Sequence, residues 1–260
     1  MLFSLGGDIM TKLMTLHQVA ELLAIPPSTL RYWDKQGLIQ LSRGANHYRQ
    51  ISLHNLVNII DVMQFREMDI SIEQVKQTPL MDETALLALL AENKTKLTQK
   101  IKAIKQIIHK IELKQRALNR VMALKNHSLI SEYKQLGTIY QADLDYAFDI
   151  QGYLSPFQSA DIYYPSNLDH EIAGMFCPSR SKIILREADN QPRLCLTGLM
   201  YRDNLTGEHN LAELCHTAVA MGYQVEQVIS QFLAFANNQE SGLRDYFEVW
   251  LMVEERQTAQ

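Results

Sequence analysis

The feature that most limits the fold is a hydrophobic repeat that runs from Leu87 to Met122 without a proline or glycine. Its positions alternate in steps of three and four residues, as the core positions of a coiled coil do. Only Lys94 and Gln115 interrupt its apolar character. The repeat predicts one unbroken helix, roughly 54 Å long at a rise of about 1.5 Å per residue. A single helix cannot bury this seam against itself, so the helix needs a partner, most simply a second copy of the chain.

Charge separates this helix from the rest of the chain. Residues 94–126 contain 10 Lys or Arg and 1 Asp or Glu, whereas residues 127–260 contain 8 and 18, within a whole-chain net charge of −4. Such differences in net charge between consecutive segments indicate that the segments belong to structural parts with different surroundings. We therefore expect three parts: a head at 13–82, a dimerisation helix at 83–126 and a further domain at 127–260.

Composition narrows the class of protein. The chain has 260 residues, of which 47% are hydrophobic and 21% charged, and no apolar run reaches the roughly 18 residues of a membrane span. Its start lacks a basic segment leading into a long apolar stretch, which disfavours secretion. Cys177, Cys195 and Cys215 are odd in number, widely spaced and without a Cys-x-x-Cys pair. We expect a cytoplasmic protein without disulfides, bound metal or cofactor.

The head has the pattern of a winged helix-turn-helix. Thr15 and Gln18 form a capping-box pattern at the start of a first helix, and the prolines of "AIPPS" end it. A short second helix, "STLRYWDKQ", stops at Gly37. Two extended runs at 38–41 and 47–51 then predict a hairpin wing, and serines at 52 and 71 can cap two further helices.

Arginine stands beside an aromatic residue twice, as Arg31-Tyr32 in the second helix and Tyr48-Arg49 in the wing. Guanidinium groups pair with phosphate oxygens and guanine edges, so the pattern favours DNA binding. Leu30 and Trp33 would face the core. The alternative is that these are ordinary surface residues. The predicted DNA contacts are Ser28, Thr29, Arg31, Tyr32, Lys35, Arg43, Tyr48, Arg49 and Arg66.

The segment "LMTLHQVAELLAIPPSTLRYWDKQGLI", followed by "HYRQIS" and by "LHNLVNIIDVMQFREMDISIEQVK", resembles the MerR family of transcription regulators over about residues 13–125. The resemblance implies a dimer with antiparallel long helices, each subunit placing its head on half of a pseudo-palindromic promoter. It also implies that ligand binding leads the dimer to bend and untwist the promoter for RNA polymerase. By the same resemblance, Arg31, Tyr32, Tyr48, Arg49 and Arg66 contact the DNA.

Three positions depart from the pattern of that family. His47 replaces the usual glycine before the wing Tyr-Arg pair, Ile51 replaces an aromatic, and Pro26 stands where a capping Ser or Thr is usual. Because of these departures, the conformation of the wing and the length of the second helix can differ from those usual in the family.

Beyond Asn126 the hydrophobic period changes to two, which is typical of strands. We expect a half-buried strand at 140–150 and further strands at 182–187, 193–201 and 244–253. Two helices are expected at 209–221 and 224–237, on either side of Gly222. Together with the head and the long helix, this predicts a multidomain fold of helical and α+β parts, with an α+β effector-binding domain at the end.

The segment "LRDYFEVWLMVEE" places two different faces on one strand. Phe247, Val249, Leu251 and Val253 would form plain core, whereas the other face places Glu248 between Tyr246 and Trp250. A carboxylate between aromatic rings suits an organic cation. The alternative is a solvent-facing glutamate beside surface aromatics.

This tail is similar to the last strand of gyrase-inhibitor-like (GyrI-like) effector domains of multidrug-responsive activators. The similarity covers about ten residues and implies that Glu248 lies in an aromatic-lined pocket for a cationic, aromatic effector. The aromatic residues expected there are Tyr146, Phe148, Tyr201, Tyr246 and Trp250.

Two other readings remain open. The C-terminal half could be a small hydrolase tethered to a DNA-binding head, although no nucleophile elbow, phosphate loop or Ser/His/Asp grouping is visible and we assign no catalytic residue. The chain could also be an architectural DNA-binding dimer that needs no ligand.

Overall fold

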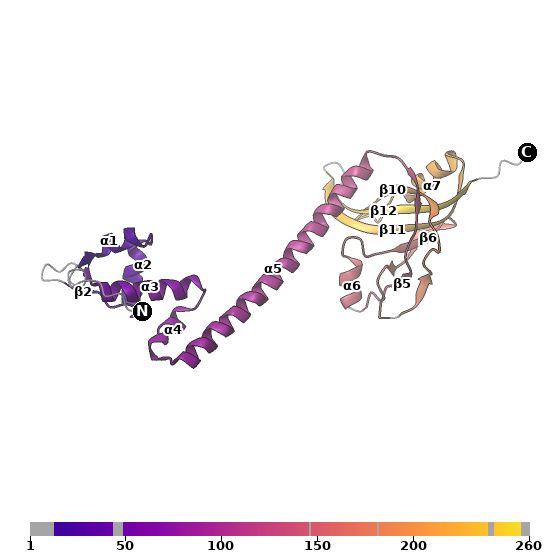
Figure 1. The fold of residues 1–260 in the computed structure, drawn as a ribbon. Helices are drawn as coiled ribbons and strands as arrows, with labels where there is room; N and C mark the ends of the chain where they lie inside the picture. The colour runs from indigo at the N-terminus through magenta and orange to yellow at the C-terminus, as the bar shows by residue number, and fades with distance from the viewer. Residues whose placement is uncertain (1–12, 44–48, 146, 181, 239–241, 256–260) are drawn as a thin grey trace, which may run out of the picture. The chain divides into compact units, whose positions relative to one another are not determined.

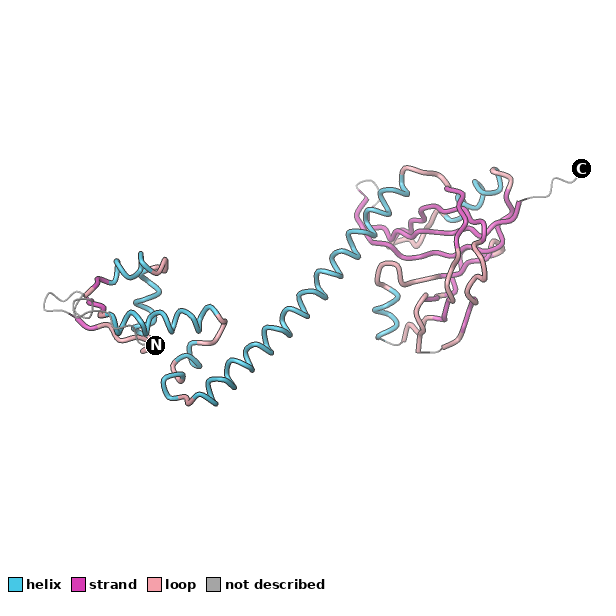
Figure 2. Tube along the Cα trace, viewed as in Figure 1, coloured by secondary structure: helices cyan, strands magenta, loops and turns pink. Residues whose placement is uncertain are grey.

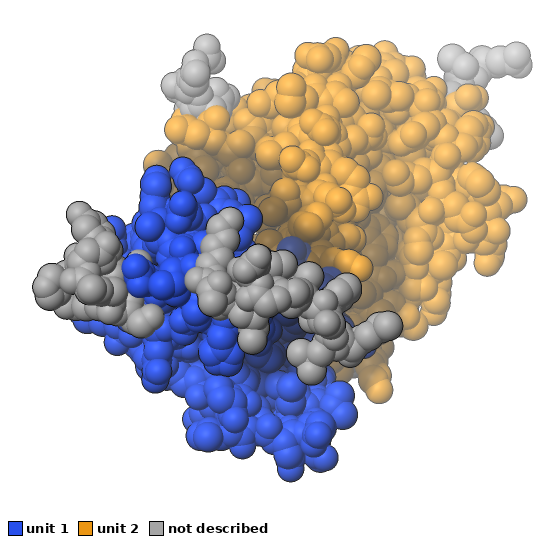
Figure 3. Space-filling model, turned by 60° about the vertical axis from the view of Figure 1, so that its left-hand side comes forward, with its two compact units in different colours: residues 1–104 blue, residues 105–260 orange. Residues whose placement is uncertain are grey.

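The computed structural model describes residues 13–43, 49–145, 147–180, 182–238 and 242–255 (Figure 1). Contacts within the chain divide it into two units, residues 1–104 and 105–260, which Figure 3 colours separately. The boundary falls inside the long helix and not at its ends. The three-part division expected from the sequence remains a proposal about how the chain is organised.

The first unit begins with a small helical head. Its elements are β1 (Met14–Thr15), α1 (Leu16–Leu22), α2 (Pro27–Lys35), β2 (Ser42–Arg43), β3 (Arg49–Ile51), α3 (Leu53–Glu67), α4 (Ile72–Val75) and a 3-10 turn, Thr78–Leu80. The short strands form one antiparallel sheet in the order β1-β3-β2. Apolar side chains from α1, α2, α3 and α4 share one core around the fully buried Leu30, Ile51 and Ile59.

The predicted local signals hold in the head. Thr15 and Gln18 form a reciprocal capping box at α1, and Ser52 and Ser71 cap α3 and α4 in the same way. Pro27 opens α2, where a missing backbone N–H costs nothing. Gly37 follows α2 with a φ of 73°, a conformation that favours glycine. The helix-turn-helix is therefore confirmed, and β2 pairs with β3 beside it. The extended run predicted at 38–41 is wrong, because the strand that pairs with β3 is Ser42–Arg43.

The long helix α5 runs unbroken from Glu83 to Lys125, as the heptad pattern predicts (Figure 2). Apolar residues of its seam remain exposed, including Ile101 at 54%, Ile108 at 48% and Met122 at 65%. Near its end a different stripe of the helix, Ala117, Val121 and Leu124, is buried against the C-terminal sheet. Among the described residues, no helix combines the length and apolar composition needed to cross a bilayer.

The second unit is built on antiparallel strands. Its main sheet has the order β4-β10-β12-β11-β6-β7, and a smaller sheet has the order β8-β5-β9. The bounds are β4 Ile130–Lys134, β5 Ile139–Gln141, α6 Ala147–Tyr153, β6 Asp161–Tyr164, β7 Asn167–Ile172, β8 Gly174–Met175, β9 Ile184–Arg186, β10 Arg193–Asp203, α7 Leu211–Ala220, β11 Tyr223–Asn238 and β12 Gly242–Glu255. The expected α+β domain is confirmed.

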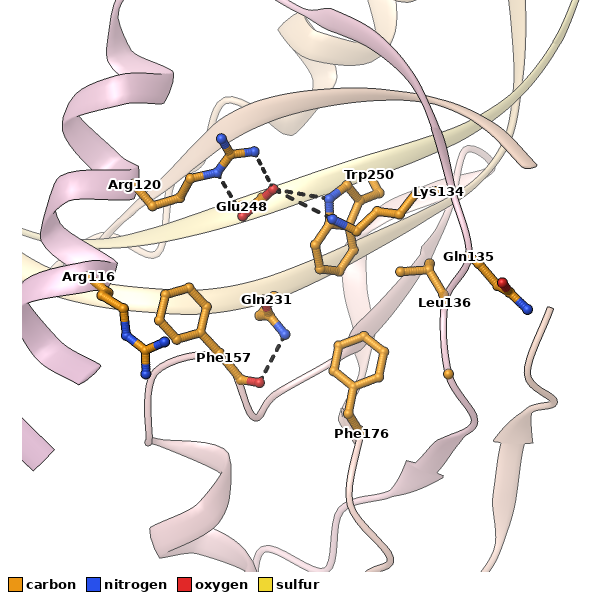
Figure 4. A pocket seen from close by; sticks show the side chains of 11 residues that line it. Arg116, Arg120, Lys134, Gln135, Leu136, Phe157, Phe176, Gln231, Glu248 and Trp250 are labelled. Carbon is orange, nitrogen blue, oxygen red and sulfur yellow. Dashed lines mark hydrogen bonds and ion pairs between the residues drawn. The ribbon is translucent and has the colours of Figure 1, made fainter. Parts of the chain in front are cut away.

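The two faces of β12 carry the two sets of side chains that the alternation in its sequence predicts, and both faces lie in cores. Phe247, Val249, Leu251 and Val253 pack with α7. On the other face, Tyr246 packs under the end of α5, while Trp250 and Met252 pack with residues of the smaller sheet. Glu248 lies on this second face, between Tyr246 and Trp250 in the strand, and Figure 4 shows its side chain beside that of Trp250.

The predicted strand at 140–150 is wrong. Strand β5 ends at Gln141, and helix α6 begins at Ala147. Between them, the backbone N–H of Asp145 donates to the side chain of Asp143 at 3.3 Å, a local turn bond that replaces strand pairing. Aspartate is also unfavourable within strands, so the apparent alternation here is a turn followed by a helix.

The predicted helix at 224–237 is also wrong, because this segment is strand β11. Two bulges, at Val225/Gln227 and Phe232/Ala234, interrupt its register with β12. Each bulge adds a residue and resets the alternation, while residues 228–233 are all buried. The period of two is thus hidden, and a continuous apolar run cannot by itself be told from a helix.

Candidate functional site

Helix α2 separates its buried and exposed side chains as predicted. Leu30 and Trp33 are buried in the core of the head. Ser28, Arg31 and Lys35 are exposed, Thr29 is partly exposed, and the ring of Tyr32 is 47% exposed. A large aromatic left open beside an arginine can lie against a sugar–phosphate backbone while the guanidinium reaches a phosphate or base edge. The exposed face of α2 is therefore suited to DNA.

The wing is described only in part. The backbone of Arg43 and Arg49 forms the β2–β3 pair, and Tyr48 lies outside the described residues, as do the side chains of both arginines. At the end of α3, the guanidinium of Arg66 donates to the backbone carbonyl of Ile70. That bond fixes Arg66 at the head and uses one of its five N–H groups. The DNA roles of all these residues remain predictions.

A cavity of about 560 Å³ lies beside Glu248 in the second unit (Figure 4). Its charged lining residues are Arg116 and Arg120 from α5, Lys134 from β4 and Glu248 from β12. Its apolar wall is formed mainly by Phe157, Phe176, Trp250 and Leu136. The volume falls within the range of about 300–1,000 Å³ that is usual for small-molecule pockets.

Glu248 is only 5% exposed and is held by several donors. Arg120 donates from Nε to Oε2 at 3.1 Å and from Nη2 to Oε1 at 2.7 Å. The indole Nε1 of Trp250 donates to Oε1 at 3.2 Å, and Nζ of Lys134 lies 4.0 Å from the same oxygen. The hydrogen bond to Glu248 raises the pKa of Arg120 above its ordinary value. Arg120 and Trp250 thus supply hydrogen-bond donors to both oxygens of a carboxylate that is almost completely buried.

The other residues predicted to bind ligand do not gather at this cavity. Tyr201 and Tyr246 line a separate cavity of about 350 Å³, together with Lys125 and Arg244. Phe148 belongs to α6 but its side chain is not described, and Tyr146 lies outside the described residues. Of the six predicted ligand residues, only Glu248 and Trp250 therefore line the cavity beside Glu248, within the part of the chain that the structure describes.

The sequence reasoning missed the cations at this cavity. Arg116 and Arg120 are four residues apart on α5, which places them on one face of the helix. That spacing was available in the sequence as a signal. Nothing in the sequence pairs Arg120 with Glu248, because 128 positions separate them. Phe157, Phe176 and Gln231 were missed for the same reason.

A buried carboxyl group lies elsewhere in the same unit. Asp161 is completely buried, accepts hydrogen bonds from Ser230 Oγ at 3.3 Å and from Tyr153, and lies near Glu171 and Arg202. Burial is the largest cause that raises the pKa of this carboxyl from 3.8 to about 7, and the charge of Glu171 adds to it.

We expect the stability of the domain to fall as pH rises through this window. Between pH 3.8 and about 7, Asp161 keeps its proton in the folded state but loses it in the unfolded state. The contribution of Asp161 to stability is therefore fully present below pH 3.8 and is lost progressively as pH rises to about 7. The slope is at most about 1.4 kcal/mol per pH unit. Urea unfolding at several pH values measures it. Asp161→Asn removes this contribution, whereas Glu112→Gln, at an exposed position of α5, retains it. Equal slopes in both variants would contradict the assignment.

Within the described part of the chain, no group of three or more His, Cys, Asp or Glu side chains is placed to hold a metal ion. The three cysteines are unpaired there, and burial raises the pKa of Cys195 and of Cys215 to about 11. Thiols of this kind are poor nucleophiles and poor metal ligands.

A helix-turn-helix joined to a short strand wing, with a basic and aromatic outer face on its second helix, defines the head as a DNA-binding domain of the winged class. Residues 15–51 match the family model described as "MerR family regulatory protein". The chain thus carries a MerR-family DNA-binding domain at its N-terminal end.

Two solved structures are similar to part of the chain. One is HiNmlR, described as a MerR family regulator lacking the sensor domain and bound to promoter DNA. It has 22% identity and a TM-score of 0.35, over 44% of this chain and 92% of that one. The other is a MerR family transcriptional regulator from Bacillus cereus, with 14% identity and a TM-score of 0.38, over 40% of this chain and 81% of that one. No curated protein matches the chain.

Proposed function

We propose that the chain is a dimeric, cytoplasmic transcription regulator that binds a pseudo-palindromic promoter and responds to a small molecule in its C-terminal domain. The observation that carries the proposal is the match of residues 15–51 to the MerR family, on a head whose α2 exposes Arg31, Tyr32 and Lys35. Two such heads read the two half-sites of one promoter. Ligand binding then bends and untwists the promoter, so that RNA polymerase can use it.

The dimer part of this proposal is supported by α5. Its apolar seam keeps a regular three-four spacing and remains exposed, with Ile104 at 54% and Ile111 at 52%. Exposed apolar stripes of this length are unfavourable in water, and a second copy of the same helix covers them with matching spacing. The occupant proposed for this face is therefore a second copy of the chain.

The effector part is supported by the cavity beside Glu248 and by its position at the end of α5. The sequence predicts an organic cation as the ligand. The cavity offers such a cation the carboxylate of Glu248 and the indole ring of Trp250. Such a cation binds only if it displaces Arg120 from Glu248, because Arg120 already occupies both carboxylate oxygens. The class of ligand therefore has to be tested separately from DNA binding.

The proposal is tested by selecting bound fragments from a pool of random duplexes with the purified full-length chain. We expect enrichment of a sequence with two inverted half-sites, and binding that weakens steeply as salt rises, because phosphate contacts release counterions. Retention of duplexes without any enriched symmetric sequence would contradict a promoter-specific dimer. Absence of any duplex binding at low salt would contradict the function as a whole.

A further inference from the structure

Three of the five aromatic rings predicted to bind a cation already have a cation of the chain itself beside them. Nζ of Lys134 lies 4.2 Å from the ring centre of Trp250, and Nζ of Lys125 lies 4.6 Å from that of Tyr246. The guanidinium of Arg244 lies 4.0 Å from the ring centre of Tyr201. Each ring face therefore has an internal partner, and a cationic ligand would compete with it.

The carboxylate of Glu248, at the cavity, likewise already has partners within the chain. Glu248 receives two bonds from Arg120 and one from Trp250. Displacing Arg120 would leave its guanidinium without its carboxylate partner in a half-buried place, which is costly. A cationic ligand would then also face Arg116, Arg120 and Lys134 together, and like charges at close range repel.

The charges that line the cavity are three cations against one carboxylate. Arg120 is paired with Glu248, whereas Arg116 is exposed on the same face of α5 and has no carboxylate partner among the described residues. Glu132 does not line the cavity, but it acts on Arg120 through space and accepts from Thr197. Counting Glu132 as well still leaves one positive charge in excess, so the cavity attracts anions.

The remaining wall is apolar and aromatic. Phe176 and Trp250 lie edge to face with ring centres 6.1 Å apart, and Phe157 lines the cavity across from them (Figure 4). Such a wall can pack against a flat apolar group, but it makes no favourable contact with a small inorganic ion. The ligand that fits both features has one negative group and an apolar body.

We propose that this cavity binds a small organic anion, such as an aromatic carboxylate. Its charge lies against Arg116 and Lys134, and its ring packs among Phe157, Phe176 and Trp250. The inference rests on the proposed function, in which this domain receives the effector, and it names the class of that effector. Since Arg116 belongs to α5 and Lys134 to β4, one anion bound to both ties the end of the dimerisation helix to the sheet. Ligand binding is thereby linked to the helix that joins the two subunits.

The test uses three probes with the same ring: naphthoate, naphthylmethylammonium and neutral naphthylmethanol. Calorimetric titration of the full-length protein gives each dissociation constant. We expect naphthoate to bind about 10-fold or more tightly than the other two, because charge-assisted hydrogen bonds are the strong ones. Arg116→Ala should weaken naphthoate binding about 10-fold and leave naphthylmethanol unchanged. Lys110→Ala, which removes an exposed charge elsewhere on α5, should change neither.

Other results would overturn the inference. Tighter binding of naphthylmethylammonium, strengthened by Arg120→Ala and abolished by Glu248→Gln, would establish the cation site expected from the sequence. No binding of naphthoate at about 1 mM would also overturn the anion site, since such affinity is worth only about 4 kcal/mol. The duplex selection is run on the same preparation. Loss of the anion preference with intact DNA binding refutes this inference alone, whereas absence of DNA binding refutes the proposed function.

Discussion

A glutamate in place of Ile104 will separate the two subunits of the proposed dimer at micromolar concentration. Ile104 lies in the middle of the exposed seam of α5, where its side chain is 54% exposed in a single chain. In a paired coiled coil the new carboxylate would be buried at both copies of this position without a partner, and burial of an unpaired charge is strongly unfavourable. We expect the dimer dissociation constant to rise at least about 100-fold, or 2.7 kcal/mol.

Sedimentation equilibrium measures this change, and the matched control is Gln106→Glu. Position 106 is exposed and lies two residues from Ile104, on the side of the helix away from the seam. The control adds the same negative charge to the same basic helix, so a general electrostatic effect would appear in both variants. If Ile104→Glu sediments as a dimer with unchanged affinity, the seam is not the subunit interface.

Replacement of Arg31 by alanine will abolish selective recognition of the promoter while the head stays folded. The side chain is exposed on α2, on the side opposite the buried Leu30 and Trp33, so its loss leaves the core intact. An arginine that contacts a guanine edge or a phosphate contributes about 1–3 kcal/mol. Because the proposed dimer uses two copies, we expect affinity for the selected duplex to fall by roughly 100-fold or more.

The measurement is a gel-shift titration with the selected duplex and with a scrambled duplex. Lys76→Ala serves as the control, since it removes one exposed charge of the same head at the end of α4, where no DNA contact is predicted. If Arg31 only neutralises phosphate, binding to both duplexes will fall equally and the salt slope will decrease by about 2, roughly one for each subunit. Unchanged binding to both would remove Arg31 from the interface.

Much of the first unit could be predicted because its signals are local. Capping residues, the Pro-Pro break and Gly37 each act within a few residues of their position, and the three-four spacing of the α5 seam holds from Leu87 to Met122. From these signals the positions of the helices in the head and the bounds of the long helix were predicted closely. The alternation along β12 likewise predicted which of its side chains share a face and that one face is core.

Prediction failed where tertiary pairing overrides local pattern. The bulges of β11 are set by its pairing with β12, and they disrupt the alternation that would have identified a strand. Strand β5 ends at Gln141, and the described residues just after it include a local aspartate turn. Neither the partner strand nor the number of paired residues can be read from the segment itself.

The sequence by itself determined that this chain has a winged head with an exposed Arg31-Tyr32 face, an unbroken helix with an unpartnered apolar seam, and an alternating last strand that carries Glu248. All three follow from side-chain spacing along one element. Only the tertiary structure decided what surrounds Glu248. Folding brings Arg120 and Lys134 to its carboxylate and places Tyr201 and Tyr246 at another cavity. The net charge of a cavity depends on residues far apart in the sequence, because it arises only when separate elements pack together.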